Sequence, residues 1–174
     1  MTRRSRSILI GFLLLFASPA AAEPLVAVCF TPGADCTGVI VRELAGAKRT
    51  ILVQAYSFTS ASIAKALVDA KKRGVDVQVI LDKSQRSERY TIATFLANAD
   101  VPTFIDECCA IAHNKVIVID VEIVITGSFN FTKAAQERNA ENLLVIRDRA
   151  LALRYAENWR RHLGTAAPYE RQAK

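Results

Sequence analysis

The chain has 174 residues, a formal net charge of +6 at pH 7 and 51% hydrophobic residues. This length and apolar content suffice for one domain with a real core. The sequence contains no linker, low-complexity tract or internal repeat, which excludes repeat and fibrous architectures. The modest positive charge suits an anionic partner but does not require one.

Residues 1–22 have the pattern of an export signal. Three arginines precede an apolar run, residues 8–16, and small residues then end in an A-x-A-like site at Ala22. The apolar run has nine residues, against the roughly 20 that span a bilayer, so cleavage is favoured over a retained anchor. We expect a mature domain of residues 23–174 with a formal charge of +3. It would be periplasmic or secreted, without stable membrane association after cleavage.

The four cysteines of an exported chain favour disulfides. Cys29 and Cys36 flank a turn-rich segment, and a bridge between them would contribute roughly 2–3 kcal/mol in the chain-entropy model. Cys108 and Cys109 are adjacent, so we expect free thiols or a link to another chain. Four cysteines allow three pairings, among which the sequence does not choose.

In the first half of the chain, β-rich runs alternate with helical patterns. The predicted strands are 25–30, 50–57, 75–81 and 101–105. The predicted helices are 39–48, 60–73 and one that ends near residue 98. Residues 82–89 are polar and charged, which predicts a loop.

The second half begins with two apolar runs, 115–119 and 122–126, whose tight spacing predicts an antiparallel hairpin. A short helix over 131–138, a strand over 142–146 and a final amphipathic helix over 149–163 follow. This order predicts an α/β fold: a single-domain mixed β-sheet flanked by helices on both faces.

The pattern H-x-K-x4-D-x6-G-S-x-N is formed by His113, Lys115, Asp120, Ser128 and Asn130. Its first half alone arises by chance in about one chain in a hundred of this length, and the G-S-x-N part makes the whole far rarer. Residues two apart on a strand share a face. The hairpin should therefore bring Ser128 and Asn130 beside His113 and Lys115 in one pocket.

These residue types suit the cleavage of a phosphodiester. Imidazole is a nucleophile at neutral pH and leaves phosphorus readily afterwards. The Lys115 ammonium and the Asn130 amide can neutralise or hydrogen-bond the non-bridging oxygens, where charge develops. Because these donors stabilise the developing charge, we expect the reaction to need neither a metal ion nor another cofactor.

The chain resembles the phospholipase D superfamily, and within it the small bacterial endonucleases of the Nuc type, which carry one motif copy per chain. Segments 53–59, 70–75 and 127–132 support this resemblance, which covers nearly all of the mature chain. It implies that His113 forms a phosphohistidine while Lys115 and Asn130 hold the phosphate. It further implies that Glu141 orients the His113 ring with help from Ser128. Asp120, although part of the motif, is then better interpreted as a structural partner.

The reaction of this family needs two histidines, a nucleophile and a general acid. The chain has only His113 and His162, and we expect His162 to be a solvated residue that complements the helix dipole. A homodimer that pairs His113 of both subunits is therefore predicted. A zinc site at Cys108, Cys109 and His113 is disfavoured, because adjacent cysteines have poor ligand spacing.

The basic residues of the polar loop, Lys83, Arg86 and Arg89, are expected either to contact substrate or to be solvated surface. Of Tyr56 and Phe58, we expect one in the core and one near the pocket. The leading hypothesis is a metal-independent, low-specificity endonuclease that acts on DNA, with RNA as a second substrate. The alternatives are a phospholipase D-type lipid phosphodiesterase and a nucleic-acid-binding module with a relic site.

Overall fold

A mixed eight-stranded β-sheet forms the centre of the computed structural model, which describes residues 25–87 and 91–169. The expected export signal, residues 1–22, and Arg89 lie outside the described residues. In chain order the strands are β1 (Leu25–Thr31), β2 (Thr50–Ala55), β3 (Asp76–Asp82), β4 (Thr103–Asp106), β5 (Lys115–Ile119), β6 (Ile123–Gly127), β7 (Glu141–Arg147) and β8 (Ala167–Pro168). Their order across the sheet is β1-β7-β6-β5-β2-β3-β4-β8. Only the pairs β2–β3 and β3–β4 are parallel.

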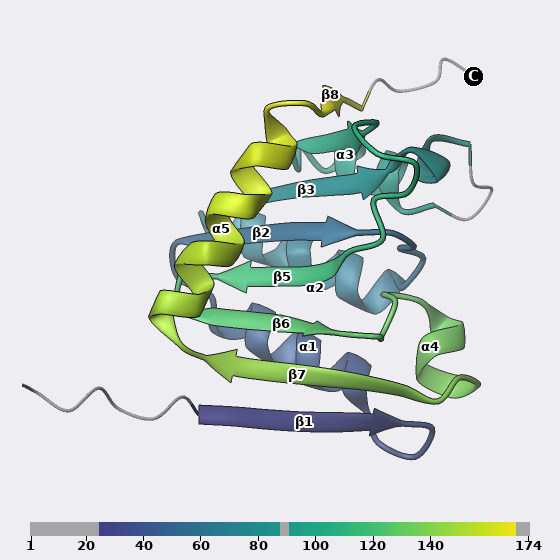
Figure 1. The fold of residues 1–174 in the computed structure, drawn as a ribbon, viewed down its shortest axis with the longest axis vertical. Coiled ribbons are helices and arrows are strands. Elements are labelled where there is room, and N and C mark those ends of the chain that lie inside the picture. The colour runs from purple at the N-terminus through teal and green to yellow at the C-terminus, as the bar shows by residue number, and fades with distance from the viewer. Residues whose placement is uncertain (1–24, 88–90, 170–174) are drawn as a thin grey trace, which may run out of the picture.

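The helices cover both faces of the sheet, as predicted (Figure 1). They are α1 (Cys36–Gly46), α2 (Ala61–Lys72), η1 (Lys83–Arg86, a 3-10 turn), α3 (Ala93–Asn98), α4 (Lys133–Glu137) and α5 (Arg149–Leu163). The larger core cluster packs the helices α1, α2, α3 and α4 against one face of the sheet. Of the described helices, α5 packs against the opposite face. No helix within 25–87 and 91–169 combines the length and the apolar composition needed to cross a membrane.

The central strands are buried on both faces, which explains their continuous apolar sequence. In β2, Ile51 and Val53 belong to the larger cluster, and Leu52 belongs to the cluster beneath α5. Trp159 of α5 is 2% exposed, and its indole N–H donates a 2.8 Å hydrogen bond to the Val53 carbonyl. This bond satisfies the one polar group of a large buried ring, so α5 has a fixed position over the sheet.

Capping residues explain where the helices begin. The side chains of Asp35, Ser60, Thr132 and Asp148 each accept a hydrogen bond from an amide in the first turn of α1, α2, α4 and α5. The Asp35 cap starts α1 three residues earlier than the apolar periodicity predicts. The predicted loop 82–89 instead contains η1, which is capped by Asp82, and β8 was not predicted.

A disulfide between Cys29 and Cys36 joins β1 to the first residue of α1. Cys108 and Cys109 are free and exposed. Both lie in the connection 107–114, which leads from β4 past the ends of β3 and β2 to β5 (Figure 1).

Asp120 forms the tight turn between β5 and β6. Its φ is 55°, in the left-handed region that aspartate tolerates better than most residues. The carboxylate accepts hydrogen bonds of 2.7–2.9 Å from the amides of Lys48, Arg49 and Thr50. Burial alone would raise the pKa of Asp120, but these amide bonds outweigh it, and the pKa lies below its usual value. The side chain therefore fastens the hairpin to the start of β2.

Replacing Asp120 by asparagine should lower the free energy of unfolding at pH 7 by about 1–3 kcal/mol, because a neutral amide cannot accept from three amides as the carboxylate does. A group with a depressed pKa in the folded state stabilises above its unfolded pKa and loses that contribution as pH falls through the folded value. The difference from wild type should therefore shrink below about pH 4.

Urea titrations across pH 2–8 would measure this dependence. Glu122→Gln is a suitable control, because Glu122 and Arg49 form an ion pair with side chains 52% and 60% exposed, and exposed ion pairs contribute little to stability. A D120N variant as stable as this control would contradict the structural role of Asp120.

Candidate active site

His113 and Lys115 lie where the connection 107–114 enters β5. His113 is exposed, whereas Lys115, the first residue of the strand, is 7% exposed. Ala55 of β2 is the strand partner of Lys115, and the Tyr56 amide donates to the Asn114 carbonyl at 2.8 Å. The end of β2 therefore holds the backbone between the two motif residues.

Tyr56 packs against both His113 and Lys115. Its ring centroid lies 4.6 Å from that of His113, with the planes tilted by 59°, and the Lys115 Nζ lies 5.1 Å from the centroid of the Tyr56 ring. Phe58 is fully buried, so Tyr56 is the aromatic residue near the pocket. Within the described chain, no hydrogen bond holds the His113 ring, and its edge is free to meet another molecule.

Ser128 and Glu141 meet where β6 ends and β7 begins. The Ser128 hydroxyl donates to a Glu141 carboxylate oxygen at 2.6 Å and accepts from the Asn142 amide at 3.1 Å. The other carboxylate oxygen accepts from the Asn139 side chain at 2.9 Å. Asn139 and Asn142 were not singled out in the sequence, although both flank Glu141 in a polar run.

Gly127 makes this junction possible. A Cβ at this position would lie 2.3 Å from the Asn142 carbonyl oxygen, and φ is +146°. The same oxygen accepts from the amides of Ser128 and Phe129 at 3.1 and 3.2 Å. The motif therefore needs glycine before serine because β6 and β7 approach too closely for a side chain.

Asn130 leaves an unsatisfied polar atom at the site. Its side-chain oxygen is buried and has no hydrogen-bond partner among the described residues. Buried polar atoms normally have partners, and an exception calls for one from outside. The Nδ2 group of the same amide is not among the buried atoms without partners, and an amide N–H is the donor that a phosphate oxygen requires.

The electrostatics of the pocket centre on Lys115. Burial lowers the pKa of its ammonium below the usual value, and the negative charge of Glu141 acts in the opposite direction. One Nζ hydrogen is donated to the His113 carbonyl at 3.1 Å. A partly desolvated cation without a paired carboxylate attracts an anion strongly.

The fold therefore brings His113, Lys115, Ser128 and Glu141 to one end of the sheet, through the contacts described above. The carboxylate of Glu141 contacts Ser128 and Asn139, and no hydrogen bond between described residues joins it to His113. Its role in orienting the imidazole stays a prediction.

Two groups of residues predicted for the site have other contacts. The motif groups Asp120 with the catalytic residues. Asp120 lies at the opposite end of β5, where its carboxylate accepts hydrogen bonds from three backbone amides. It is structural, because a strand separates it from His113. Lys83 donates to the Cys109 carbonyl at 3.0 Å, and Arg86 pairs with Glu107 at 2.7 Å, so both brace the connection 107–114 while their charges stay at the surface.

His162 differs from the expectation of a solvated histidine. Its Nδ1 lies 2.6 Å from the Asp106 carboxylate, and its side chain is 21% exposed. It borders a pocket that contains none of the motif residues. Sequence periodicity could not reveal this pair, because 56 residues separate its members. Within the chain, the catalytic pocket therefore contains one histidine.

Residues 40–163 match the family described as cardiolipin synthase, PLD-like domain. A phospholipase D from Rickettsia felis is 47% identical over 134 residues, which are 77% of this chain and 67% of that protein. The chain belongs to the phospholipase D-like family. Its fold matches the phospholipase D family member Nuc from Salmonella typhimurium, with a TM-score of 0.81 and 40% identity over 86% of this chain and 100% of that one.

Two more distantly related proteins are also similar to this chain. NucT from Helicobacter pylori has a TM-score of 0.79 at 24% identity, over 84% of this chain and all of that one, which supports the fold. A mitochondrial cardiolipin hydrolase from Xenopus laevis is 32% identical over 68% of this chain and 57% of that protein. As a member of the phospholipase D-like family, the chain is a phosphodiesterase, and the group of residues around His113 is its candidate active site.

The charge of Glu141 should support the protonated state of Lys115. In Glu141→Gln the titration midpoint of Lys115 should move to lower pH, because removing a nearby negative charge disfavours the ammonium. NMR of ¹³C-labelled lysine side chains would follow this midpoint without relying on activity. Glu122→Gln, at the other end of the sheet, should leave the midpoint unchanged. An unchanged midpoint in E141Q, or equal shifts in both variants, would contradict the proposed pairing of charges.

Proposed function

We propose that the chain is an exported, metal-independent endonuclease of low sequence specificity that hydrolyses phosphodiester bonds of DNA, and of RNA as a second substrate. The observation that carries the proposal is the exposed imidazole of His113, beside a buried cation and an unsatisfied amide. The likeness to Nuc, over the whole of that chain, favours a nuclease. The pattern of residues 1–22 supports export to the periplasm or beyond.

The proposed reaction has two steps on the His113 imidazole. In the first, a ring nitrogen attacks phosphorus, a P–N bond forms, and the bond to the leaving oxygen breaks. In the second, water attacks the phosphohistidine, the P–N bond breaks, and the imidazole is released. Lys115 and Asn130 stabilise the charge on the non-bridging oxygens throughout. Their N–H donors do this work without a metal ion.

A proton must reach the leaving oxygen in the first step and leave the water in the second. His162 cannot serve, because it is held by Asp106 in a different pocket. We therefore assign this role to His113 of the partner subunit in a two-fold symmetric homodimer. Because no residue in the described part of the chain forms a hydrogen bond with the exposed ring of His113, two such rings can face one phosphate.

The second candidate is a phospholipase D-type lipid phosphodiesterase. Its support is the name of the Rickettsia relatives, which are 44–47% identical to this chain. The reacting groups recognise a phosphodiester, not what it connects, so both substrates share one chemistry. Exposed Lys83 and Arg86 favour a nucleic-acid backbone, since cations on a surface loop neutralise successive phosphates.

Cleavage of plasmid DNA and of phosphatidylcholine vesicles, both in excess EDTA, should separate the candidates. Wild type should cleave DNA, and His113→Ala should lose activity at least about 1,000-fold, because it removes the nucleophile. Lys65→Met, an exposed residue of α2, is the matched control and should retain full activity.

Hydrolysis of the vesicles without DNA cleavage would reject the nuclease hypothesis and support the lipid phosphodiesterase, and the assignment of the active site would still hold. DNA cleavage by H113A at the wild-type rate would reject the site itself.

A further inference from the structure

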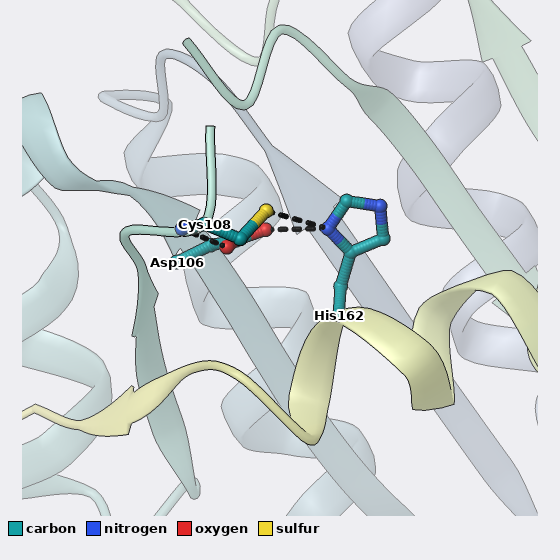
Figure 2. A group of neighbouring side chains, drawn as sticks. All are labelled: Asp106, Cys108 and His162. Atoms are coloured by element: carbon teal, nitrogen blue, oxygen red, sulfur yellow. Dashed lines mark hydrogen bonds and ion pairs between the residues drawn. The ribbon is translucent and has the colours of Figure 1, made fainter. Parts of the chain in front are cut away.

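Three side chains of ligand type converge outside the catalytic pocket (Figure 2). Asp106 ends β4, Cys108 follows in the connection 107–114, and His162 lies in the last turn of α5. One ligand atom from each lies within 4.8 Å of the other two. Figure 2 shows the carboxylate and the thiol both directed at the Nδ1 of His162.

The distances fit a metal ion after a small adjustment. The Cys108 Sγ lies 3.7 Å from the His162 Nδ1, and an Asp106 oxygen lies 2.6 Å from the same nitrogen. Around tetrahedral zinc, neighbouring N, O and S ligands lie roughly 3.3–3.7 Å apart, given their usual bond lengths. The sulfur and nitrogen already have this spacing, and the carboxylate needs to withdraw by less than about 1 Å.

The surroundings leave room for a further ligand. A surface pocket of about 220 Å³ opens beside Cys108 and His162. Arg161 borders this pocket, but its guanidinium donates to the Asn158 side chain at 3.0 Å. The Asp106 side chain is fully buried, and the Cys108 amide donates to its second oxygen at 3.1 Å. One ligand is thus already oriented by the backbone, as metal-binding carboxylates usually are.

We propose that Asp106, Cys108 and His162 form a binding site for a divalent transition-metal ion of the zinc class, with water in the fourth position. One carboxylate and one thiolate balance the charge of the ion, and a mixed O, N and S donor set suits zinc. The proton of the Cys108 thiol leaves to solvent on binding. This set differs from the disfavoured trio Cys108, Cys109 and His113, because the fold substitutes Asp106 and His162 for two of its members.

The site would fasten the start of the connection 107–114 to the end of α5. That connection ends at the exposed His113 and carries the carbonyl that Lys83 contacts. A bound ion would therefore rigidify the segment that presents the nucleophile, without touching the substrate. The reaction at His113 remains independent of metal, and the proposed site is structural.

Titration of the reduced wild-type protein with Co²⁺ and Zn²⁺ tests the proposal. Co²⁺ should give a thiolate charge-transfer band that Zn²⁺ abolishes at one equivalent. Cys108→Ser and His162→Gln should each weaken Zn²⁺ binding by at least about 100-fold, since each removes a direct ligand. Cys109→Ser is the matched control: the Cys109 Sγ lies 2.8 Å from the Cys108 Sγ but is outside the proposed ligand set, so the variant should keep the band and bind Zn²⁺ far more tightly than C108S.

Thermal unfolding of each variant without metal shows whether it is folded, and thiol counting shows that Cys108 is reduced. Wild-type affinity in folded C108S or H162Q would overturn the site. A loss in C109S as large as in C108S would overturn the assignment of ligands, as would the absence of a stoichiometric Co²⁺ complex in the wild type.

Discussion

The close contact between the end of β6 and the start of β7 determines the active site. The Asn142 carbonyl accepts from the amides of Ser128 and Phe129, and only glycine fits at position 127 beside it. This crossing places the Ser128 hydroxyl against Glu141 and turns the chain toward Asn130. Without it the return strand of the hairpin would separate from β7, and the arrangement of the two strand ends beside His113 would be lost.

In the resulting site, the Lys115 ammonium lies within the electrostatic influence of the Glu141 carboxylate. Lys115 is buried, and among residues 25–87 and 91–169 no carboxylate forms an ion pair with it and no group forms a hydrogen bond with the buried side-chain oxygen of Asn130. Burial of these two groups costs free energy, since desolvated polar groups normally have partners. The Lys115 ammonium and the Asn130 Nδ2 group are hydrogen-bond donors that match the oxygens of a phosphodiester. Of the two histidines in the sequence, His113 lies in this site and His162 lies beside Asp106.

Much of the fold could be predicted from the sequence. A strand or a helix that buries one face repeats its apolar residues every 2 or 3.6 positions, and these repeats are visible in the sequence. The hairpin of β5 and β6 and the final helix were predicted to within one residue, since each has a clear apolar pattern and a turn or cap at its end. The start of α1 and the turn η1 were not, because the side-chain bonds of Asp35 and Asp82 decide them. The two-residue β8 is too short to have a periodicity.

The site was predictable where its members are neighbours in sequence or belong to one motif. The pairing of Asp106 with His162 was not, because nothing in the sequence relates a strand end to a helix end 56 residues away. Asp120 belongs to the motif, and the resemblance already indicated a structural role for it. Regular spacing in sequence groups it with His113, whereas β5 carries it to the other end of the sheet, where three amides hold it.

The central claim is that one chain supplies half of a phosphodiesterase site and that a second His113 completes it. Co-expression of wild type and H113A with two different tags would allow the mixed dimer to be purified. It should have below about 1% of the wild-type DNA cleavage rate, because general acid catalysis is lost, while a mixed dimer of wild type and K65M should be fully active. About half of the wild-type rate would show that each chain has a complete site and would contradict the claim, as would full activity of a monomer.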